Sequence, residues 1–278
     1  MGARLAQALA PIGTVLATSR RELDLADADA LRQHVRDARP DVIVNAAAYT
    51  AVDRAETETE LASAVNAVAP GILAEEAKRL GALLVHYSTD YVFDGEKAGA
   101  YVETDPTNPL SAYGRSKLAG EQAITASGCR HLIFRTSWVY APRGKNFLLT
   151  ILKAARERPE LKVVDDQVGA PTTAIDIAKM TVRAIERASR EGIVGTFHMA
   201  ALGQTSWCDF AREIIGSAGL QAKVVGIPSS EYRAAARRPL NSRLDSSKLG
   251  AVLGIRPRDW HEGLDGLVAA AVENSKLM

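Results

Sequence analysis

Tyr113 and Lys117 are the two residues whose types and spacing most directly suggest chemistry. They stand four positions apart, so on a helix their side chains share one face. A cation beside a phenol favours the phenolate, so we expect Lys117 to lower the pKa of Tyr113 and to make the phenol a proton donor and acceptor near neutral pH. The pair predicts chemistry on a carbonyl or an alcohol.

A second polar group precedes this pair. Ser88, Thr89 and Asp90 follow the apolar run 83–87, which is typical of a buried strand, and they place hydroxyl groups at its end. On its own, a Tyr-x-x-x-Lys spacing also fits a solvated helical pair. The hydroxyl-bearing strand end upstream favours an active site.

The elements that must position these residues follow from hydrophobic periodicity. Short β-branched runs alternate with longer stretches of helical period, which predicts an α/β fold: a Rossmann-like, doubly wound parallel sheet. Pro109 disfavours an earlier helix, and Ser111 can cap the helix that carries Tyr113. Strands are predicted at residues 14–17, 41–44, 83–87, 132–135, 162–164 and, as the last, 196–198; helices are predicted at 1–9, 28–38, on either side of Asn66, after Ser111 and from Ala174.

The chain changes character near Asn146, which predicts two parts. Residues 1–145 are expected to form an NAD(P)-binding Rossmann-like domain that lacks its first strand. Residues 146–278 are expected to form mainly a smaller substrate-binding lobe, partly interleaved, with segments that return to the first domain.

The Gly-x-Gly-x-x-Gly fingerprint expected between a first strand and a first helix is absent. Residues 1–9 already have the period of that helix, which makes Gly2 the last glycine of the set. Such a first strand is central, and cofactor pyrophosphate lies on the loop after it. Losing it would cost about 5 to 10 kcal/mol of apolar burial, comparable to a whole domain's stability. We therefore expect Met1 to be a misplaced start or a truncation.

Composition limits the possible partners. The 278 residues include 34 basic and 33 acidic side chains without long runs of one sign, which argues against binding to nucleic acid or to an acidic membrane. Every apolar run is far shorter than the roughly 18 to 20 residues of a membrane span. Cys129 and Cys208 lack disulfide-motif or metal spacing, so we expect reduced thiols in a cytoplasmic protein. No metal site is predicted, and His86 and His198 are interpreted as core groups.

Several motifs together resemble a known family. Those at residues 24–25, 45–48, 88–95 and 113–117 resemble the extended short-chain dehydrogenase/reductases. Those at residues 135–140, 166–172 and 238–245 narrow the resemblance to the dTDP-4-dehydrorhamnose reductases, because several of them fall in the expected substrate lobe. The resemblance extends from Gly2 to at least Trp260.

This resemblance implies an oxidoreductase that uses NADPH to reduce the C4 keto group of dTDP-4-dehydro-L-rhamnose to dTDP-L-rhamnose, a sugar donor for the cell envelope. Tyr113 would be the general acid that protonates the C4 oxygen. Lys117 would hold the nicotinamide ribose and depress the pKa of Tyr113. Thr89 would hydrogen-bond the carbonyl and stabilise charge on its oxygen.

The cofactor site is expected where small residues end the second predicted strand, because they let a cofactor approach the backbone. An arginine after the strand 14–17 can meet a 2′-phosphate, which favours NADPH over NADH. A solvated basic turn is an alternative interpretation of that arginine. The predicted cofactor-binding residues are Gly2, Ser19, Arg20, Asp24, Leu25, Asn45, Ala46, Ala47, Ser88, Tyr113 and Lys117.

The substrate site is expected to combine a guanidinium for the diphosphate with amides and a flat apolar face for the sugar. The predicted substrate-binding residues are Thr89, Asp90, Trp138, Asn146, Gln167 and Arg238, although Trp138 could equally lie in the core. Some members of the family form dimers bridged by magnesium through an acid on the first helix. Arg4 aligns with that acid here, so a Mg²⁺ site is doubtful and a monomer or weak homodimer is expected.

Two alternatives remain open. Another nucleotide-sugar epimerase or dehydratase would share the tyrosine and the lysine, but Thr89-Asp90-Tyr91 lacks the glutamate that follows in a dehydratase. The second alternative is that the chain is a non-catalytic regulatory subunit with the same fold, as is the similar β-subunit of methionine adenosyltransferase. The presence of Thr89, Tyr113 and Lys117 argues against that role, and the missing glycine loop argues mildly for it.

Overall fold

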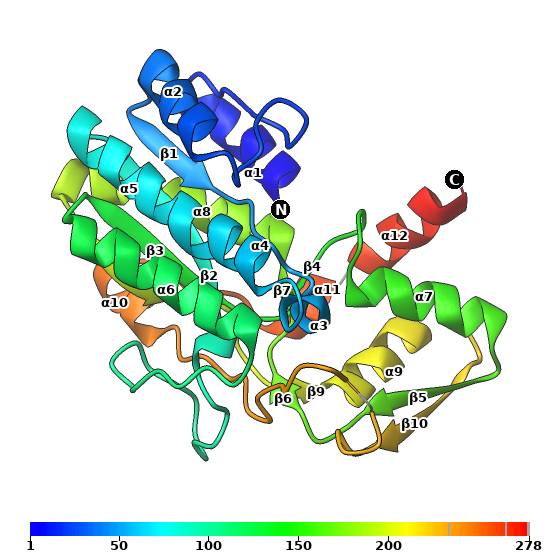
Figure 1. Ribbon diagram of the computed structural model, residues 1–278. Helices are drawn as coiled ribbons and strands as arrows, with labels where there is room; N and C mark the ends of the chain where they lie inside the picture. The colour runs from blue at the N-terminus through cyan, green and yellow to red at the C-terminus, as the bar shows by residue number, and fades with distance from the viewer. Residues whose placement is uncertain (233, 265, 277–278) are drawn as a thin grey trace.

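A four-stranded parallel sheet forms the centre of the larger part of the molecule (Figure 1). The computed structural model describes residues 1–232, 234–264 and 266–276. The strand order is β1-β2-β3-β8, and the predicted parallel α/β fold is confirmed. The strands are β1 (Val42–Asn45), β2 (Leu83–Thr89), β3 (His131–Thr136) and β8 (Gly195–His198).

Helices cover both faces of this sheet, as the alternation along β2 requires. Leu83 and Val85 point to one face and pack with residues of α1 (Gly2–Leu9), α8 (Ala174–Glu191) and α10 (Ser247–Leu253). Leu84 points to the opposite face and packs with α2 (Ala28–Ala38), α5 (Ala69–Leu80) and α6 (Ala112–Ser127). β2 is therefore buried along its whole length.

Local capping explains where two of these helices begin. The Asp27 side chain accepts a hydrogen bond from Ala30 N at the start of α2, and Ser111 accepts one from Gly114 N at the start of α6. Both helices begin where the sequence predicts. The shorter segments of this part are η1 (Ala10–Ile12), α3 (Val52–Ala55), α4 (Thr59–Ser63), η2 (Ala64–Val68) and η3 (Asp90–Val92).

The second part of the molecule surrounds a separate apolar cluster that includes Leu148, Leu152, Phe210, Ile214 and Trp260. Three small sheets hold its loops: β5 and β10 pair in parallel, β4 and β7 pair in parallel, and β6 and β9 pair antiparallel. Its elements are β4 (Val139–Tyr140), α7 (Phe147–Glu157), β5 (Glu160–Val164), β6 (Val168–Gly169), β7 (Thr172–Thr173), β9 (Thr205–Ser206), α9 (Trp207–Ser217), β10 (Lys223–Ile227), α11 (Trp260–Leu264) and α12 (Leu267–Lys276).

Two expectations about elements are wrong. Residues 14–17 form no strand; no described strand pairs with them, and Leu16 is 69% exposed. The strand at 195–198 is not the last, because β10 follows it and pairs with β5 outside the main sheet. The helices predicted on either side of Asn66 are confirmed: α4 precedes it and α5 follows it, and Asn66 itself lies in the π-helical turn η2 that joins them.

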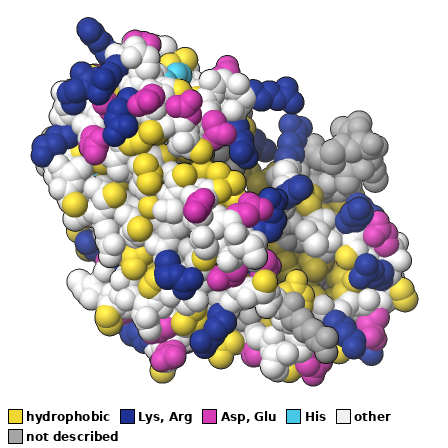
Figure 2. Space-filling view, viewed as in Figure 1, with side chains coloured by type: hydrophobic (Ala, Val, Ile, Leu, Met, Phe, Trp, Pro, Cys, Tyr) yellow, Lys and Arg dark blue, Asp and Glu magenta, His cyan; other side chains and the backbone are white. Residues whose placement is uncertain are grey.

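No described helix combines the length and the apolar character needed to cross a bilayer. On the face shown in Figure 2, basic and acidic side chains are interspersed.

Candidate active site

The predicted catalytic residues meet at the carboxyl ends of the central strands. Thr89 ends β2 and pairs in register with Thr136 at the end of β3. Tyr113 and Lys117 come from the first two turns of α6, which packs against β2 and β3. The cap at Ser111 fixes the start of that helix. The packing of α6 on β2 and β3 then holds the helix beside the strands.

Tyr113 is a protonated phenol in this geometry. Burial raises the pKa of Tyr113 to about 12, the charge of Asp90 raises this pKa too, and a hydrogen bond with Thr89 opposes the rise. The expectation that Lys117 lowers the pKa of Tyr113 is wrong here, because the Lys117 ammonium hydrogen-bonds other groups. At neutral pH the phenol therefore keeps its proton and can donate it to a bound group that becomes basic enough.

Lys117 is 1% exposed, and its ammonium points toward β2. Nζ donates a 2.6 Å hydrogen bond to the Tyr87 carbonyl and lies 3.1 Å from His86 Nε2. Burial lowers the pKa of Lys117 to about 8, and the charge of Glu121 opposes this decrease. Glu121 is itself bonded to Arg135, whose Nη2 lies 2.6 Å from Oε2 in a buried ion pair.

Asp90 is buried beside Thr89, and its Oδ1 accepts a 3.0 Å hydrogen bond from the Thr89 hydroxyl. Burial raises the pKa of Asp90 to about 6, while hydrogen bonds from Ser242 and Thr89 oppose the increase. The carboxyl thus connects the strand end to the loop that carries Ser242. Near neutral pH it holds a negative charge at a cost in burial free energy.

Three buried polar atoms at these strand ends have no hydrogen-bond partner among the described residues: Ser88 Oγ, Asp90 Oδ2 and Thr136 Oγ1. Buried polar atoms in native proteins are almost always paired. Unpaired atoms gathered at the ends of β2 and β3 therefore fit a ligand that supplies hydrogen-bonding groups. The site has the polarity that a sugar and a nicotinamide ribose require.

The residues predicted to bind the cofactor divide into two groups. Asn45, Ala46 and Ala47 lie at the carboxyl end of β1, next to Ser88 on the neighbouring strand; Asn45 pairs in register with His86. The small side chains leave the backbone approachable there. This end of the sheet fits the nicotinamide half of a dinucleotide.

The other group lies on the exposed segment before α2 or at the start of α1. Arg20 forms a loose ion pair with Asp24 at 3.7 Å, and Ser19 N donates to Glu22. Leu25 packs against the cluster under α2 and α5, and Gly2 opens α1, where Met1 supplies no side-chain cap. Roles for these residues in binding adenine or phosphate stay predictions.

Trp138 joins the two parts of the molecule. Its ring stacks on Trp207 with centroids 3.6 Å apart, and its backbone has a φ of 48°. A Cβ added at Gly169 would lie 2.6 Å from the indole, so the glycine admits the ring. Trp138 is 9% exposed, and its contact with substrate stays a prediction.

The other predicted substrate residues make protein contacts. Asn146 caps α7 by accepting from Leu149 N, and Gln167 Nε2 donates to Ser229 Oγ at 2.9 Å. Arg238 forms a two-pronged ion pair with Asp53 of α3, with Nη2 2.7 Å from Oδ2. The guanidinium is thus near the sheet ends but already engaged by a carboxylate.

Sequence reasoning missed four residues of this region: Asp53, His86, Thr136 and Ser242. Thr136 could have been found, because parallel pairing of two predicted strands places it opposite Thr89. His86 was interpreted as a core group, and it is buried, but it also contacts Lys117. The contacts of Asp53 and Ser242 join distant segments and leave no local signal.

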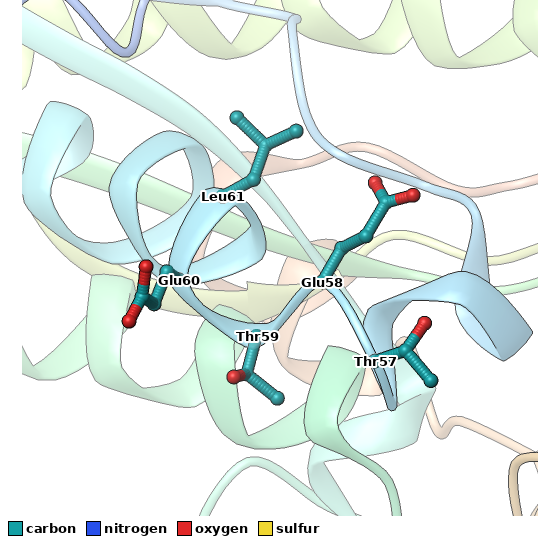
Figure 3. Close-up of a pocket in the computed structure, with 5 residues that line it drawn as sticks. All are labelled: Thr57, Glu58, Thr59, Glu60 and Leu61. Atoms are coloured by element: carbon teal, nitrogen blue, oxygen red, sulfur yellow. The ribbon is translucent and has the colours of Figure 1, made fainter.

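A surface hollow beside α4 lies apart from these residues (Figure 3). It is lined by residues 57–61, which end the turn after α3 and begin α4, and the Glu58 carboxylate there accepts from Tyr49 Oη at 2.6 Å. No predicted site residue lines it. Within the described residues there is also no group of three His, Cys, Asp or Glu side chains that could hold a metal ion.

Comparison with known proteins gives consistent matches along the chain. Residues 1–273 match the family model described as the RmlD substrate binding domain. The dTDP-4-dehydrorhamnose reductase of Burkholderia thailandensis is 50% identical over 273 residues, covering 94% of this chain and 92% of the relative. The enzyme of the same name from Escherichia coli K12 is 43% identical over 275 residues, covering 95% and 92%.

Solved structures agree with these matches. A dTDP-4-dehydrorhamnose reductase from Clostridium acetobutylicum superposes with a TM-score of 0.92 at 37% identity, covering 96% of this chain and 94% of that one. The reductase from Bacillus anthracis, solved in complex with NADP, has a TM-score of 0.89 at 34% identity and covers 96% of both chains.

Proposed function

Because this chain belongs to the RmlD substrate binding domain family, we propose that it is an NADPH-dependent oxidoreductase that converts dTDP-4-dehydro-L-rhamnose to dTDP-L-rhamnose. The observation that carries the proposal is the meeting of a buried Tyr113 phenol, the Thr89 hydroxyl and the Lys117 ammonium at the strand ends. An epimerase or a dehydratase would share the tyrosine and the lysine, but the relatives with high identity carry the reductase name.

Tyr113 protonates the C4 oxygen of the keto-sugar. Its high pKa keeps the proton on the phenol until negative charge develops on the substrate oxygen, which then becomes basic enough to accept it. Thr89 hydrogen-bonds the same oxygen and stabilises that charge.

NADPH supplies the hydride when it is bound. Asn45, Ala46, Ala47 and Ser88 line the end of the sheet that would hold its nicotinamide half, and the unpaired Ser88 hydroxyl supports this assignment. Lys117 would hold the ribose. Gly2 begins α1, and the backbone N–H groups of this first turn, which no side chain caps, would bind phosphate; Arg20 would meet a 2′-phosphate.

The substrate lobe would comprise mainly residues 146–278. The nucleotide would be bound by Gln167 and Arg238 of this lobe and by Trp138, which precedes it. Arg238 is the group best suited to a diphosphate, since a guanidinium binds two oxygens at once. Asp90 and the unpaired Thr136 hydroxyl would contact the sugar. We further propose a cytoplasmic protein that is a monomer or a weak homodimer.

The test is NADPH oxidation, followed by absorbance, with enzymatically generated dTDP-4-dehydro-L-rhamnose. The wild-type chain should consume NADPH in step with sugar reduction. Tyr113→Phe should lower turnover roughly 100-fold to 10,000-fold with nearly unchanged NADPH affinity, because it removes the proton and little else. Turnover that survives this change would show that Tyr113 is not the acid. Tight NADPH retention without net oxidation would favour an epimerase.

A further inference from the structure

His86 is a buried imidazole beside the proposed catalytic lysine, and the reaction as described does not use it. It lies in β2 and is 1% exposed. Its Nε2 is 3.1 Å from Lys117 Nζ, and its Nδ1 is 3.1 Å from the side-chain amide of Asn45. Both ring nitrogens therefore contact residues assigned to the cofactor site.

The chemistry of these contacts fixes the proton on the ring. A lysine ammonium has donors and no acceptor, so Nε2 must accept from it and the ring proton must sit on Nδ1. The Asn45 atom beside Nδ1 is the amide nitrogen Nδ2, which is a donor, so the amide must turn to bring its oxygen to the Nδ1 proton. This turn gives up the long 3.3 Å hydrogen bond that Ala47 N donates to Asn45 Oδ1. Burial and the nearby ammonium hold the pKa of His86 well below its usual value, so the ring stays neutral.

We propose that His86 is a positioning residue for Lys117, and that Asn45 selects the tautomer of His86 that lets it act. The inference rests on the proposed function of Lys117. Two of the three Nζ protons are taken by Tyr87 O and His86 Nε2, both on β2. The third proton is left to face the cofactor ribose. His86 thereby sets the direction of the ammonium and helps it to stay charged.

The surrounding charges show why this neutral acceptor matters. Glu121 lies one turn along α6 from Lys117, but its carboxylate accepts hydrogen bonds from the guanidinium of Arg135 in β3. Asp90 acts on Tyr113 from the end of β2. Without the imidazole, the ammonium would keep one hydrogen bond to the described residues, to Tyr87 O, in a buried position. Its pKa should then fall further, because burial is the main force lowering it.

The test uses ligand-free protein and NMR. Ring-nitrogen shifts identify the tautomer of His86, and a lysine labelled at Cε reports the titration of Lys117, assigned by its loss in Lys117→Met. We expect the neutral Nδ1–H form of His86 throughout the neutral range. The pKa of Lys117 should fall by about one unit or more in His86→Leu and should return close to the wild-type value in His86→Gln, whose amide oxygen can accept.

A second readout is NADPH affinity at two pH values. Between neutral pH and about one unit above the wild-type Lys117 pKa, His86→Leu should lose affinity about 10-fold more than His86→Gln. His198→Gln is the matched control, because His198 is also a buried strand histidine but bonds Tyr101 O. It should leave Lys117 unchanged.

The Nε2–H tautomer in wild-type protein, or equal Lys117 titrations in wild type, His86→Leu and His86→Gln, would overturn the proposal. If His86→Leu does not fold, the wild-type tautomer and the His86→Gln titration decide. The NMR measurements need neither cofactor nor substrate. A chain that shows the expected tautomer and titration but never oxidises NADPH would contradict the proposed function and leave the positioning role of His86 intact.

Discussion

Asp90 illustrates how the site imposes a cost at the scale of a single residue. Its folded pKa of about 6 exceeds the ordinary value of 3.8. A carboxyl with a raised folded pKa stabilises the fold most below its unfolded pKa, and this contribution is lost as pH rises through the folded pKa. The protein should therefore lose stability from this residue between about pH 4 and pH 7.

Asp90→Asn should remove that loss while keeping the side-chain shape. Between pH 5 and pH 8 the free energy of unfolding should fall in both proteins, and the fall should be about 1 kcal/mol smaller in Asp90→Asn than in wild type. Urea titrations at the two pH values measure the difference. Asp37→Asn, on an exposed stretch of α2, is the control and should follow wild type. Identical pH dependence in Asp90→Asn and wild type would contradict the raised pKa.

At the scale of elements, the packing of α6 depends on glycines that face neighbouring backbone. A Cβ at Gly120 would lie 2.2 Å from Asn66 O, in the π-helical turn η2. Asn66 also bonds Ser116 on α6 and both backbone groups of Tyr49. The close approach holds α6, which carries Tyr113 and Lys117, against η2.

Gly120→Ala should therefore destabilise the fold by about 2 kcal/mol or more, because neither backbone can move freely. Gly216→Ala is a matched change in α9, where a Cβ meets nothing within 4 Å. It should be neutral or stabilise by up to about 1 kcal/mol, since alanine is the better helix former. Chemical denaturation of the two variants measures both effects. A stabilising Gly120→Ala would refute the tight contact.

What the sequence predicted at this scale followed from local signals. The start of α6 depends on Pro109 and Ser111, and α2 on its cap and its apolar spacing, so both were found. Residues 14–17 have strand-like composition, but a strand also needs a paired neighbour, which composition does not report. The pKa of Tyr113 was misjudged for the same reason. A four-residue spacing brings Lys117 to the same helix face, but the atoms that its Nζ contacts belong to β2.

At the scale of the whole molecule, Arg238 and Asp53 connect segments 185 positions apart. Asp53 belongs to α3 and also accepts from Ala236 N, so it holds the loop that carries Arg238. If Arg238 binds the substrate diphosphate, the carboxylate competes with the phosphate for the same guanidinium nitrogens. The ion pair would keep the arginine ready while the site is empty.

Calorimetric binding of dTDP tests this competition. Arg238→Met should weaken binding about 10-fold or more, and Asp53→Asn should tighten it several-fold, because the guanidinium is freed. The neighbouring exposed Arg237→Met is the control for charge alone and should have a small effect. Equal losses in Arg237→Met and Arg238→Met would mean that dTDP responds to general charge rather than to the paired guanidinium.

The apolar layer on one face of the main sheet also has a consequence for biosynthesis. It joins Leu5 and Leu83 to Ile177, Leu249 and Ile255, so it closes only when nearly the whole chain is available. A nascent chain on the ribosome would expose the apolar side of β2 and β3 throughout that delay. We expect such long-range closure to slow folding and to leave the growing polypeptide prone to aggregation until its C-terminal segments emerge.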